Sequence, residues 1–379
     1  MIQINKKIDD FLRRTDIDSP CLLIDLEVVA EKYHAITKAM PYADCYYALK
    51  ANPAEEILSL LHALGCKFEA ASIFEIERCL SVEVRPEHII FGNPIKKSAD
   101  IRKAYELGVR TFVFDSHIEL DKLATHAPGA NVICRISSGG SGAVWPLSRK
   151  FGCQEFQAIS MLVEAKAKRL SPRGISFHVG SQQTRVEAWD EAIIEVAHIF
   201  NVLQSYDITL DIVDIGGGFP VKYRNQSPPT IEECGVKIQQ VLDRSFPEKV
   251  PNVIIEPGRF MVAESGVIQS EVILISYNHE ENKKRWVYLD IGKYGGLIEA
   301  EDTQYAVITD KDGTVAASAT IAGPTCDSLD VIYEKAEYRL PLSLDVGDKI
   351  RFLGTGAYTS TYASVGFNGF PPLKTYFIS

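Results

Sequence analysis

The sequence lacks the long apolar segments that mark membrane and secreted proteins. No stretch of its 379 residues approaches the ~18 consecutive apolar residues of a membrane-spanning helix. The first segment, MIQINKKIDDFLRRTDIDSP, interrupts its apolar residues with charges, so it lacks the apolar core of a signal peptide. We therefore expect a soluble, cytoplasmic protein that does not bind a membrane.

Basic charge is also scarce. The chain has 40 Lys and Arg residues against 50 Asp and Glu residues, which gives a net charge of −10. No run of like charges is long enough to form a basic groove, so nucleic acid is not an expected partner. A cationic small molecule would not be repelled by this overall charge.

The cysteines occur singly, without a CxxC pair and without the spacing of a metal site. They are Cys21, Cys45, Cys66, Cys79, Cys134, Cys153, Cys234 and Cys326. We expect free thiols in a reducing compartment and no bound metal.

Low-complexity linkers and short repeats are missing as well, and a hydrophobic content of 46% can bury a large core in two domains. Between Cys45 and Gly258, strand-like runs alternate with amphipathic segments that often end at glycine, as helices do. The eight runs are CYYALK, KFEAAS, HIIFGN, TFVFDS, VICRIS, GISFHVG, IVDIGGG and VIIEPG. Eight such repeats predict a (β/α)8 barrel of the TIM type, because the alternative, a doubly wound open sheet, rarely needs eight regular repeats.

The composition and pattern of the sequence change after about Glu264. Runs such as VIQSEVILISYN, RWVYLDIG and KIRFLG are rich in β-branched and aromatic residues and predict a separate β domain. The run CLLIDL near the amino end lies outside the eight and is a candidate extra strand of that domain. We therefore expect a barrel over residues 27–264, and a β-sandwich or β-barrel domain formed by residues 1–26 and 265–379.

Polar residues gather at the ends of the predicted barrel strands, which is where barrels of this type carry their chemistry. They are Lys50 on the first run, Glu69 on the second, Arg135 on the fifth, His178 and Ser181 at the end of the sixth, Gly216, Gly217 and Gly218 on the seventh, and Glu256, Gly258 and Arg259 on the eighth. Taken singly, a strand-end lysine is usually a solvated charge and a strand histidine usually a core residue. Their coincidence on one rim predicts a site.

The chemistry of these residue types points to one cofactor. A glycine-rich turn lets backbone N–H groups approach an anion, and a nearby serine and arginine add donors, so we predict a phosphate site. A lysine partly desolvated in a barrel mouth can form an imine with a carbonyl. Phosphate and imine together suggest pyridoxal phosphate. Glu256 is then the candidate for keeping its ring nitrogen protonated, and His178 for stacking on its ring face.

Eight motifs occur in a specific order along nearly the whole chain: YYALKANP, FEAAS, SFHVGSQ, DIGGGFP, EPGR, GPTCDSLD, GAYT and FNGF. With them the sequence resembles the alanine-racemase-like pyridoxal-phosphate enzymes, specifically the basic amino acid decarboxylases typified by ornithine decarboxylase. The resemblance implies Lys50 as the Schiff-base lysine, Glu256 on the pyridine nitrogen, His178 on the ring face and Arg135 near the ring. Around the phosphate it implies Ser181, Gly218, Gly258, Arg259 and Tyr358. Eukaryotic members commonly have FDCAS where this chain has FEAAS, so the contact of Glu69 with the cofactor differs from that pattern.

The resemblance also implies a head-to-tail homodimer with shared active sites, in which Cys326 and Asp327 enter the site of the other subunit. Cys326 would return a proton to the α carbon, and Asp327 would pair with the distal ammonium of a basic amino acid. The sequence CDS favours ornithine or lysine, because diaminopimelate decarboxylases generally have Glu-Ser after the cysteine. A second acidic residue, Glu301 or Asp302, is a further candidate for that ammonium, and the motif residues Tyr358 and Phe367 are candidates for other substrate contacts.

Two other interpretations remain open. One is another pyridoxal-phosphate reaction on the same fold: racemisation, or decarboxylation of diaminopimelate, arginine or a D-amino acid. Racemases usually place an arginine at the pyridine nitrogen, so Glu256 disfavours racemisation. The other is a regulatory homologue without activity, which the joint presence of Lys50, Glu256 and Cys326 disfavours.

Overall fold

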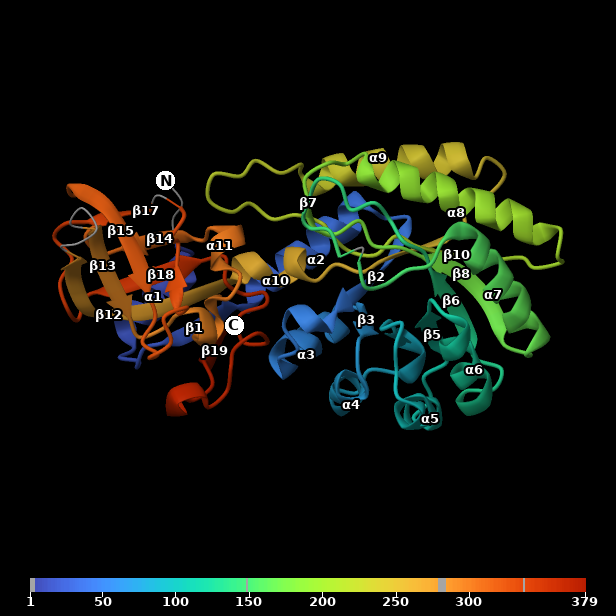
Figure 1. Cartoon of the computed structure of the whole chain (residues 1–379), viewed down its shortest axis with the longest axis horizontal. Coiled ribbons are helices and arrows are strands. Elements are labelled where there is room, and N and C mark those ends of the chain that lie inside the picture. Colours follow the sequence, from blue (N-terminus) through green and yellow to red (C-terminus); the bar gives the residue numbers. More distant parts are fainter. Residues whose placement is uncertain (1–3, 148, 279–283, 337) are drawn as a thin grey trace. The chain divides into compact units, whose positions relative to one another are not determined.

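The protein consists of two compact units, which we call the barrel unit and the β unit. The barrel unit is formed by Ala30–Pro220 and Pro228–Met261, and the β unit by Met1–Val29, Val221–Ser227 and Val262–Ser379. The computed structural model in Figure 1 describes residues 4–147, 149–278, 284–336 and 338–379.

Eight parallel strands close the barrel unit into a ring, in the order β10-β11-β2-β3-β4-β5-β6-β8. They are β2 (Ala43–Ala48), β3 (Lys67–Ala70), β4 (Ile89–Phe91), β5 (Thr111–Phe114), β6 (Asn131–Arg135), β8 (Ser171–Ser176), β10 (Ile212–Asp214) and β11 (Asn252–Ile255). Each of the eight predicted runs contains one of these strands. The predicted (β/α)8 barrel is confirmed.

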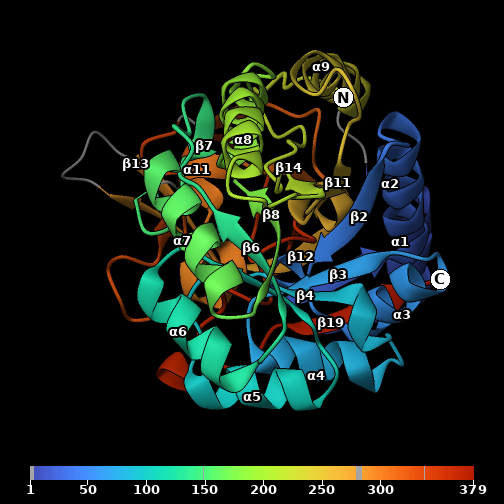
Figure 2. The same ribbon diagram turned by 90° about the vertical axis from the view of Figure 1, so that its right-hand side faces the viewer.

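Helices surround these strands, as Figure 2 shows. They are α2 (Leu26–Ala39), α3 (Glu55–Ala63), α4 (Ile73–Ser81), α5 (Ser98–Glu106), α6 (His117–His126), α7 (Glu155–Ala167), α8 (Ala188–Gln204) and α9 (Ile231–Ser245). Local sequence fixes several of their ends. Ser72 and Ser116 cap α4 and α6 by accepting backbone N–H groups, and Gly65 and Gly108 follow α3 and α5 with φ of 88° and 99°, which favours glycine.

The interior of the barrel is a packed core. Tyr46, Ile90, Val113, Ile133 and Ile254, from five different strands, form one buried cluster. Side chains alternate across a strand, so the neighbouring positions face the helices and are buried too. Because apolar side chains fill the middle of the barrel, its chemistry is confined to the strand ends.

Two loops at the carboxyl ends of the strands pair with each other. The short strands β7 (Ala143–Trp145) and β9 (Ser181–Gln183) form an antiparallel pair, with Ala143 opposite Gln183 and Trp145 opposite Ser181. This two-stranded sheet carries Ser181, which the sequence analysis placed at the end of the sixth barrel strand. The strand β8 ends earlier, at Ser176, and Gly180, at φ 95°, turns the chain into β9.

The β unit contains one curled, nine-stranded mixed sheet. Its strands are β1 (Cys21–Asp25), β12 (Gly266–Asn278), β13 (Lys284–Leu289), β14 (Ala306–Thr309), β15 (Ala316–Ala322), β16 (Val331–Ile332), β17 (Tyr338–Pro341), β18 (Lys349–Leu353) and β19 (Lys374–Ile378). The strand β1 is the predicted run CLLIDL, and it pairs with β12 and β19. Its membership of the β domain is confirmed.

The long strand β12 organises this sheet. Its first half pairs with β1 and β18, and its second half pairs with β13 after a register shift between Val272 and Leu274. Such a bulge bends a strand and increases its twist. The helix α1 (Lys6–Arg14) packs Ile8 against Cys21 and Val267, which ties the amino-terminal segment to the sheet.

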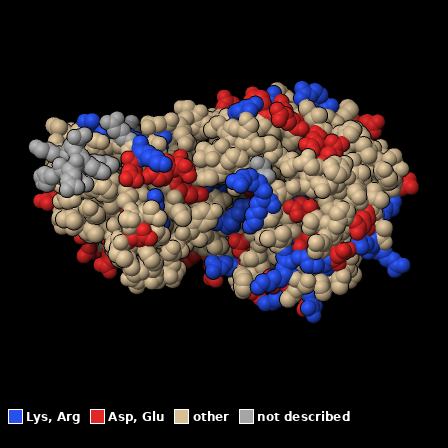
Figure 3. Space-filling view, in the orientation of Figure 1, with Lys and Arg blue, Asp and Glu red and all other residues tan. Residues whose placement is uncertain are grey.

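None of the helices among the described residues is both long and apolar enough to cross a membrane. On the face drawn in Figure 3, Lys and Arg side chains are interspersed with Asp and Glu. All eight cysteines lie within the described ranges and are free thiols, and of these Cys326 is the exposed one.

Candidate active site

A cavity of about 190 Å³ opens at the carboxyl ends of the barrel strands. Its lining includes five of the residues that the sequence analysis selected: Lys50, Glu69, Arg135, His178 and Glu256. These residues come from five different strands or the turns that follow them, and they are separated by up to about two hundred positions in the sequence. The closed barrel therefore brings together the polar groups that were predicted to share one rim.

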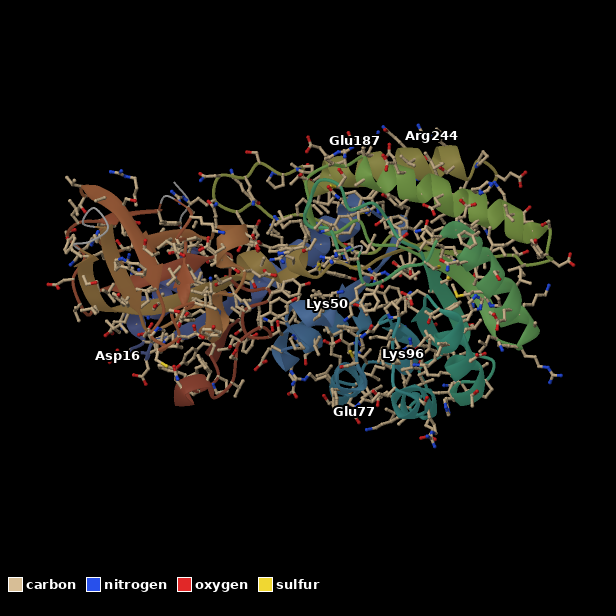
Figure 4. All side chains as sticks on the ribbon, in the orientation of Figure 1. Asp16, Lys50, Glu77, Lys96, Glu187 and Arg244 are labelled. Carbon is tan, nitrogen blue, oxygen red and sulfur yellow. The ribbon has the colours of Figure 1, made fainter. Side chains whose placement is uncertain are left out.

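Lys50 lies in a short 3-10 turn, Leu49–Ala51, directly after β2. Its side chain is 44% exposed, and its Nζ lies 3.8 Å from Oε2 of the buried Glu69 on β3. The amide of Ala48 donates to the carbonyl of Pro257, which ties the end of β2 to the EPGR turn. Figure 4 labels Lys50 among these elements.

Glu256 and Asp214 form a coupled pair of carboxyl groups at the ends of β11 and β10. Asp214 is fully buried, and its Oδ1 accepts a hydrogen bond from the Gly216 amide at 2.9 Å. Burial raises the pKa of Asp214 to about 7, although the bonds from Gly216 and Glu256 oppose this shift. Burial, and then the negative charges of Asp214 and Glu69, raise the pKa of Glu256 well above its usual range. These effects favour the protonated form of Glu256.

His178 faces the cavity two residues beyond β8. Burial, followed by the positive charges of Lys50 and Arg135, holds its pKa well below the usual value, so the imidazole is neutral. Its Nδ1 accepts a hydrogen bond from the Gly180 amide at 3.0 Å, which leaves the proton on Nε2. Arg135, at the end of β6, lies with its guanidinium carbon 5.5 Å from the centre of the Phe151 ring.

The Gly-Gly-Gly turn after β10 fits closely against its neighbours. A Cβ on Gly217 would lie 2.5 Å from the Glu256 carbonyl oxygen, and one on Gly218 would lie 2.4 Å from the Gly180 carbonyl oxygen. Gly216 and Gly218 also have φ of 65° and 98°, in the region that favours glycine. Bare backbone at this point leaves N–H groups that an anion can approach.

Arg259 lies beside this turn at the start of α10 (Arg259–Val262). Its Nε and one Nη each lie 3.4 Å from Ser181 Oγ, and its guanidinium carbon lies 4.7 Å from the centre of the Trp145 ring. Hydroxyl, guanidinium and glycine backbone are the donors that a phosphate requires.

The remaining predicted residues belong to the β unit. In the GPTCDSLD loop, the Cys326 amide donates to Asn368 Oδ1 at 3.0 Å. Asp327 accepts two hydrogen bonds, from the Tyr294 hydroxyl at 3.0 Å and from the Leu329 amide at 2.9 Å. The loop therefore holds both a thiol and an oriented carboxylate.

Three further candidates occupy separate positions in the β unit. Tyr358 has a φ of 57° and its ring lies 5.3 Å from that of Tyr362. The ring of Phe367 lies 4.8 Å from that of Tyr294, next to the Asp327 carboxylate. Asp302 is in α11 (Ala300–Thr303), beside Glu301, whose carboxylate accepts the Glu334 amide. Of these two acidic residues, Asp302 is therefore the better candidate for a ligand.

Asp214 and Trp145 are among the residues that the sequence analysis missed. Asp214 precedes the glycine turn in IVDIGGG, and a carboxylate inside an otherwise apolar strand could have revealed it. Trp145 lies in a loop without a periodic pattern. Its proximity to Arg259 depends on the pairing of β7 with β9, for which the sequence carries no signal.

The residues of the barrel unit fit pyridoxal phosphate. Oε2 of the buried Glu69 accepts no hydrogen bond from the described residues, which leaves an acceptor for a ligand. The glycine turn is closed to any Cβ, as a close approach of phosphate to backbone requires. A protonated carboxyl group at Glu256 suits a basic ring nitrogen.

Comparisons with known proteins agree with this chemistry. Residues 26–263 match the family model described as the pyridoxal binding domain of pyridoxal-dependent decarboxylases. The chain is 35% identical to a lysine/ornithine decarboxylase of Selenomonas ruminantium over 93% of this chain and 88% of that protein. It is 33% identical to antizyme inhibitor 2 of Xenopus laevis over 96% and 82%. A crystal structure of SrLDC in complex with PLP and cadaverine matches with a TM-score of 0.89 at 32% identity, over 99% and 94%.

We predict that Asp214→Asn flattens the pH dependence of stability in the cofactor-free protein. A carboxyl group whose pKa is raised on folding stabilises the native state below its unfolded pKa, and this contribution is lost as pH rises through the folded value of about 7. Wild type should therefore lose stability between about pH 4 and pH 7, and Asn should remove on the order of 3 kcal/mol of this loss.

Urea unfolding at several pH values between 4 and 8 measures the effect. The exposed residue Asp207 provides the control, because Asp207→Asn should reproduce the wild-type profile. An Asp214→Asn profile as steep as that of wild type would show that Asp214 does not titrate in this window.

Proposed function

The chain belongs to the pyridoxal-dependent decarboxylases, and we propose that it removes the α-carboxylate of a basic L-amino acid. We propose ornithine as the first substrate and lysine as the second, with putrescine and cadaverine as products. The observation that carries this proposal is the set of Lys50, Glu69, Arg135, His178 and Glu256 around one cavity. These groups can bind the cofactor, protonate it and hold it in place.

Pyridoxal phosphate, when bound, supplies a sink for the electron pair that stays on the α carbon as carbon dioxide leaves. In our proposal Lys50 binds it through the side-chain amine. Arg259, Ser181 and the amides of Gly217 and Gly218 hold its phosphate in this proposal, with Gly258 and Tyr358, while the predicted Gly216 amide donates to Asp214 instead. Their arrangement supports this role, because the Arg259 Nε lies 3.4 Å from Ser181 Oγ, and Gly218 packs against the carbonyl of Gly180, the residue before Ser181.

Glu256 keeps a proton available for the ring nitrogen. Its raised pKa means that the proton is present at neutral pH before any ligand arrives. Asp214, whose pKa is also raised but whose Oδ1 accepts the Gly216 amide, holds the neighbouring negative charge in a fixed position. The pair thus offers the proton of Glu256 beside an Asp214 carboxyl group that ionises as the pH rises through about 7.

His178 and Arg135 orient the ring. The hydrogen bond from the Gly180 amide to Nδ1 fixes the imidazole, so a neutral, flat surface faces the cavity. Arg135 supplies a positive charge at another wall of the same cavity. A substrate carboxylate would meet this charge as it enters, which favours binding of an amino acid over a simple amine.

We propose that Cys326 and Asp327 of a second copy complete the site in a homodimer. Cys326 Sγ would return the proton to the α carbon, and Asp327 would pair with the distal ammonium. The exposure of Cys326 and the two hydrogen bonds that orient Asp327 support a loop built to present both groups. Phe367 and Asp302 are further substrate contacts in this proposal.

We propose both ornithine and lysine because a binding pocket distinguishes them by only a small difference in binding free energy. Ornithine and lysine differ by one methylene, which is worth only about 1–3 kcal/mol in a pocket. A carboxylate such as Asp327 recognises the ammonium of both, whereas the guanidinium of arginine is planar and larger. The cadaverine in the SrLDC complex is consistent with a site for a diamine.

An assay of carbon dioxide release tests this function. We predict release from ornithine and lysine, and at least about tenfold lower kcat/KM for arginine and diaminopimelate. Lys50→Ala should abolish release and the absorbance at about 420 nm expected of a protonated pyridoxal imine, with an unchanged far-ultraviolet circular dichroism spectrum. Absence of release by wild type from all four amino acids would contradict the proposal and favour a regulatory homologue.

We predict that Asp327→Asn raises the KM for ornithine and lysine by at least about tenfold, because a charged hydrogen bond contributes about 1.5–3 kcal/mol. The amide can still accept from Tyr294, so the loop should keep its shape. Asp310→Asn, at an exposed ion pair with Arg351, is the control and should leave KM unchanged. Equal KM values in wild type and Asp327→Asn would exclude Asp327 as the ammonium ligand.

We predict that mixing two inactive variants restores activity if sites are shared. Lys50→Ala and Cys326→Ala should each be inactive alone. About half of randomly exchanged dimers are hybrid, and each hybrid has one site with both lesions and one with neither. Activity should return to about one quarter of wild type. Demonstrated subunit exchange without recovered activity would place both residues in the site of one chain.

A further inference from the structure

The carboxylate of Glu69 lies in a confined space beside Lys50. Glu69 is on β3, between Ala48 of β2 and Ile90 of β4 in the sheet register. Its side chain is 5% exposed, against 44% for that of Lys50, and the two charged groups are 3.8 Å apart. Because Glu69 is buried, the length of its side chain and the shape of the surrounding wall decide where its charge lies.

Gly92, the first residue after β4, forms the wall against which this side chain lies. A Cβ on Gly92 would be 2.2 Å from Glu69 Oε1, 2.7 Å from its Cγ and 2.8 Å from its Cδ. All three distances are far below van der Waals contact, and they involve the whole outer half of the glutamate. The φ of Gly92 lies outside the left-handed region, so the backbone does not require glycine here. The side chain of Glu69 requires it.

This wall is anchored and cannot easily move back. The Gly92 amide donates to the Ala70 carbonyl at 2.9 Å, which holds it beside the end of β3. Asn93 donates from its side chain to the Ala71 carbonyl at 3.2 Å. Both bonds join the loop to the same strand end that carries Glu69, so loop and carboxylate keep a fixed relation.

A buried lysine completes the anchor. Lys96, labelled in Figure 4, donates from Nζ to the carbonyls of Asn93 at 2.8 Å and Val113 at 2.7 Å. The same ammonium forms an ion pair with Glu119 of α6 at 3.0 Å, and both side chains are almost completely buried. Burial lowers the pKa of Lys96 to about 8, against the opposing effect of Glu119, so the ammonium is charged at neutral pH. Loop, strand and helix are thereby joined through one cation.

We propose that Gly92 is a positioning residue that matches the cavity wall to a glutamate at position 69 and so sets the reach of that carboxylate toward Lys50. An aspartate would retract the carboxylate by one methylene and leave space at Gly92, whereas an alanine at 92 would displace the glutamate from its place. The inference rests on the proposed function, since Lys50 and Glu69 are its cofactor-binding residues. In this proposal the missing side chain at position 92 is what allows FEAAS, with glutamate at position 69, in place of FDCAS, with aspartate there.

A double-mutant cycle tests the proposal with Gly92→Ala, Glu69→Asp and the double variant. The primary readout is the dissociation constant of pyridoxal phosphate, measured by titrating cofactor-free protein at pH 7. Visible circular dichroism of the bound chromophore and the split between kcat and KM are secondary readouts. We expect Gly92→Ala to weaken cofactor binding by at least about tenfold in wild type and by less than about threefold in the Glu69→Asp background, because contacting residues are energetically coupled.

Two controls separate length from charge and from a general effect of added bulk. Glu69→Gln keeps the length and removes the charge, so Gly92→Ala should still cost about tenfold in that background. Gly139→Ala adds a Cβ that meets nothing within 4 Å, and it should leave the dissociation constant unchanged.

Equal factors for Gly92→Ala in the wild-type and Glu69→Asp backgrounds would overturn the proposal, as would a wild-type dissociation constant in Gly92→Ala. If Gly92→Ala does not fold but the double variant with Glu69→Asp does, the steric match is supported. If neither folds, the match is refuted, because glycine is then needed whatever occupies position 69. The binding cycle needs no turnover, so failure of the decarboxylase assay and failure of this proposal are separate results.

Discussion

Closure of the eight-stranded ring is the constraint on which the site depends. The last barrel strand, β11, pairs with the first, β2, so that Ile255 lies opposite Cys45 although 210 positions separate them. This register brings the EPGR turn next to Lys50, and the bond from the Ala48 amide to Pro257 reinforces it. A slip of one residue would turn each side chain of a strand to the other face. The apolar residues inside the barrel therefore fix the polar residues at its end.

Because barrel closure places several charged and titratable side chains around one cavity, they shift one another's pKa values. Besides burial, the negative charge of Glu69 raises the pKa of Asp214 and of Glu256, while burial, Lys50 and Arg135 lower the pKa of His178. These shifts favour a proton on Glu256 and none on the imidazole of His178. The cavity thus holds both an acid and a neutral ring at the same pH. Environment, more than residue type, assigns these roles.

Much of this arrangement could be predicted from the sequence, because strands buried on both faces carry continuous apolar runs and their ends are marked by glycine and polar residues. Lys50, His178 and Glu256 were found in this way. The positions of Trp145 and Ser181 depend on the pairing of β7 with β9, which lie in two different loops, and such pairing leaves no periodic pattern in the sequence. The proposed role of Gly92 could not be predicted from the sequence, for a different reason. Glycine in FGNP suggests only a turn, and its steric role requires knowledge of what lies within 3 Å of it.

In our proposal the cavity of the barrel unit binds the cofactor, and the GPTCDSLD loop of the β unit presents Cys326 and Asp327 to a substrate. The residues of the cavity are held by strand register and by glycine packing, which tolerate little change. Asp327 is held in a loop by the Tyr294 hydroxyl and the Leu329 amide, and a loop can shift by a fraction of an ångström at small cost. A difference of one methylene between substrates needs adjustments of about that size. Under the proposed function, selectivity between ornithine and lysine can therefore change through the GPTCDSLD loop without a change in the barrel cavity.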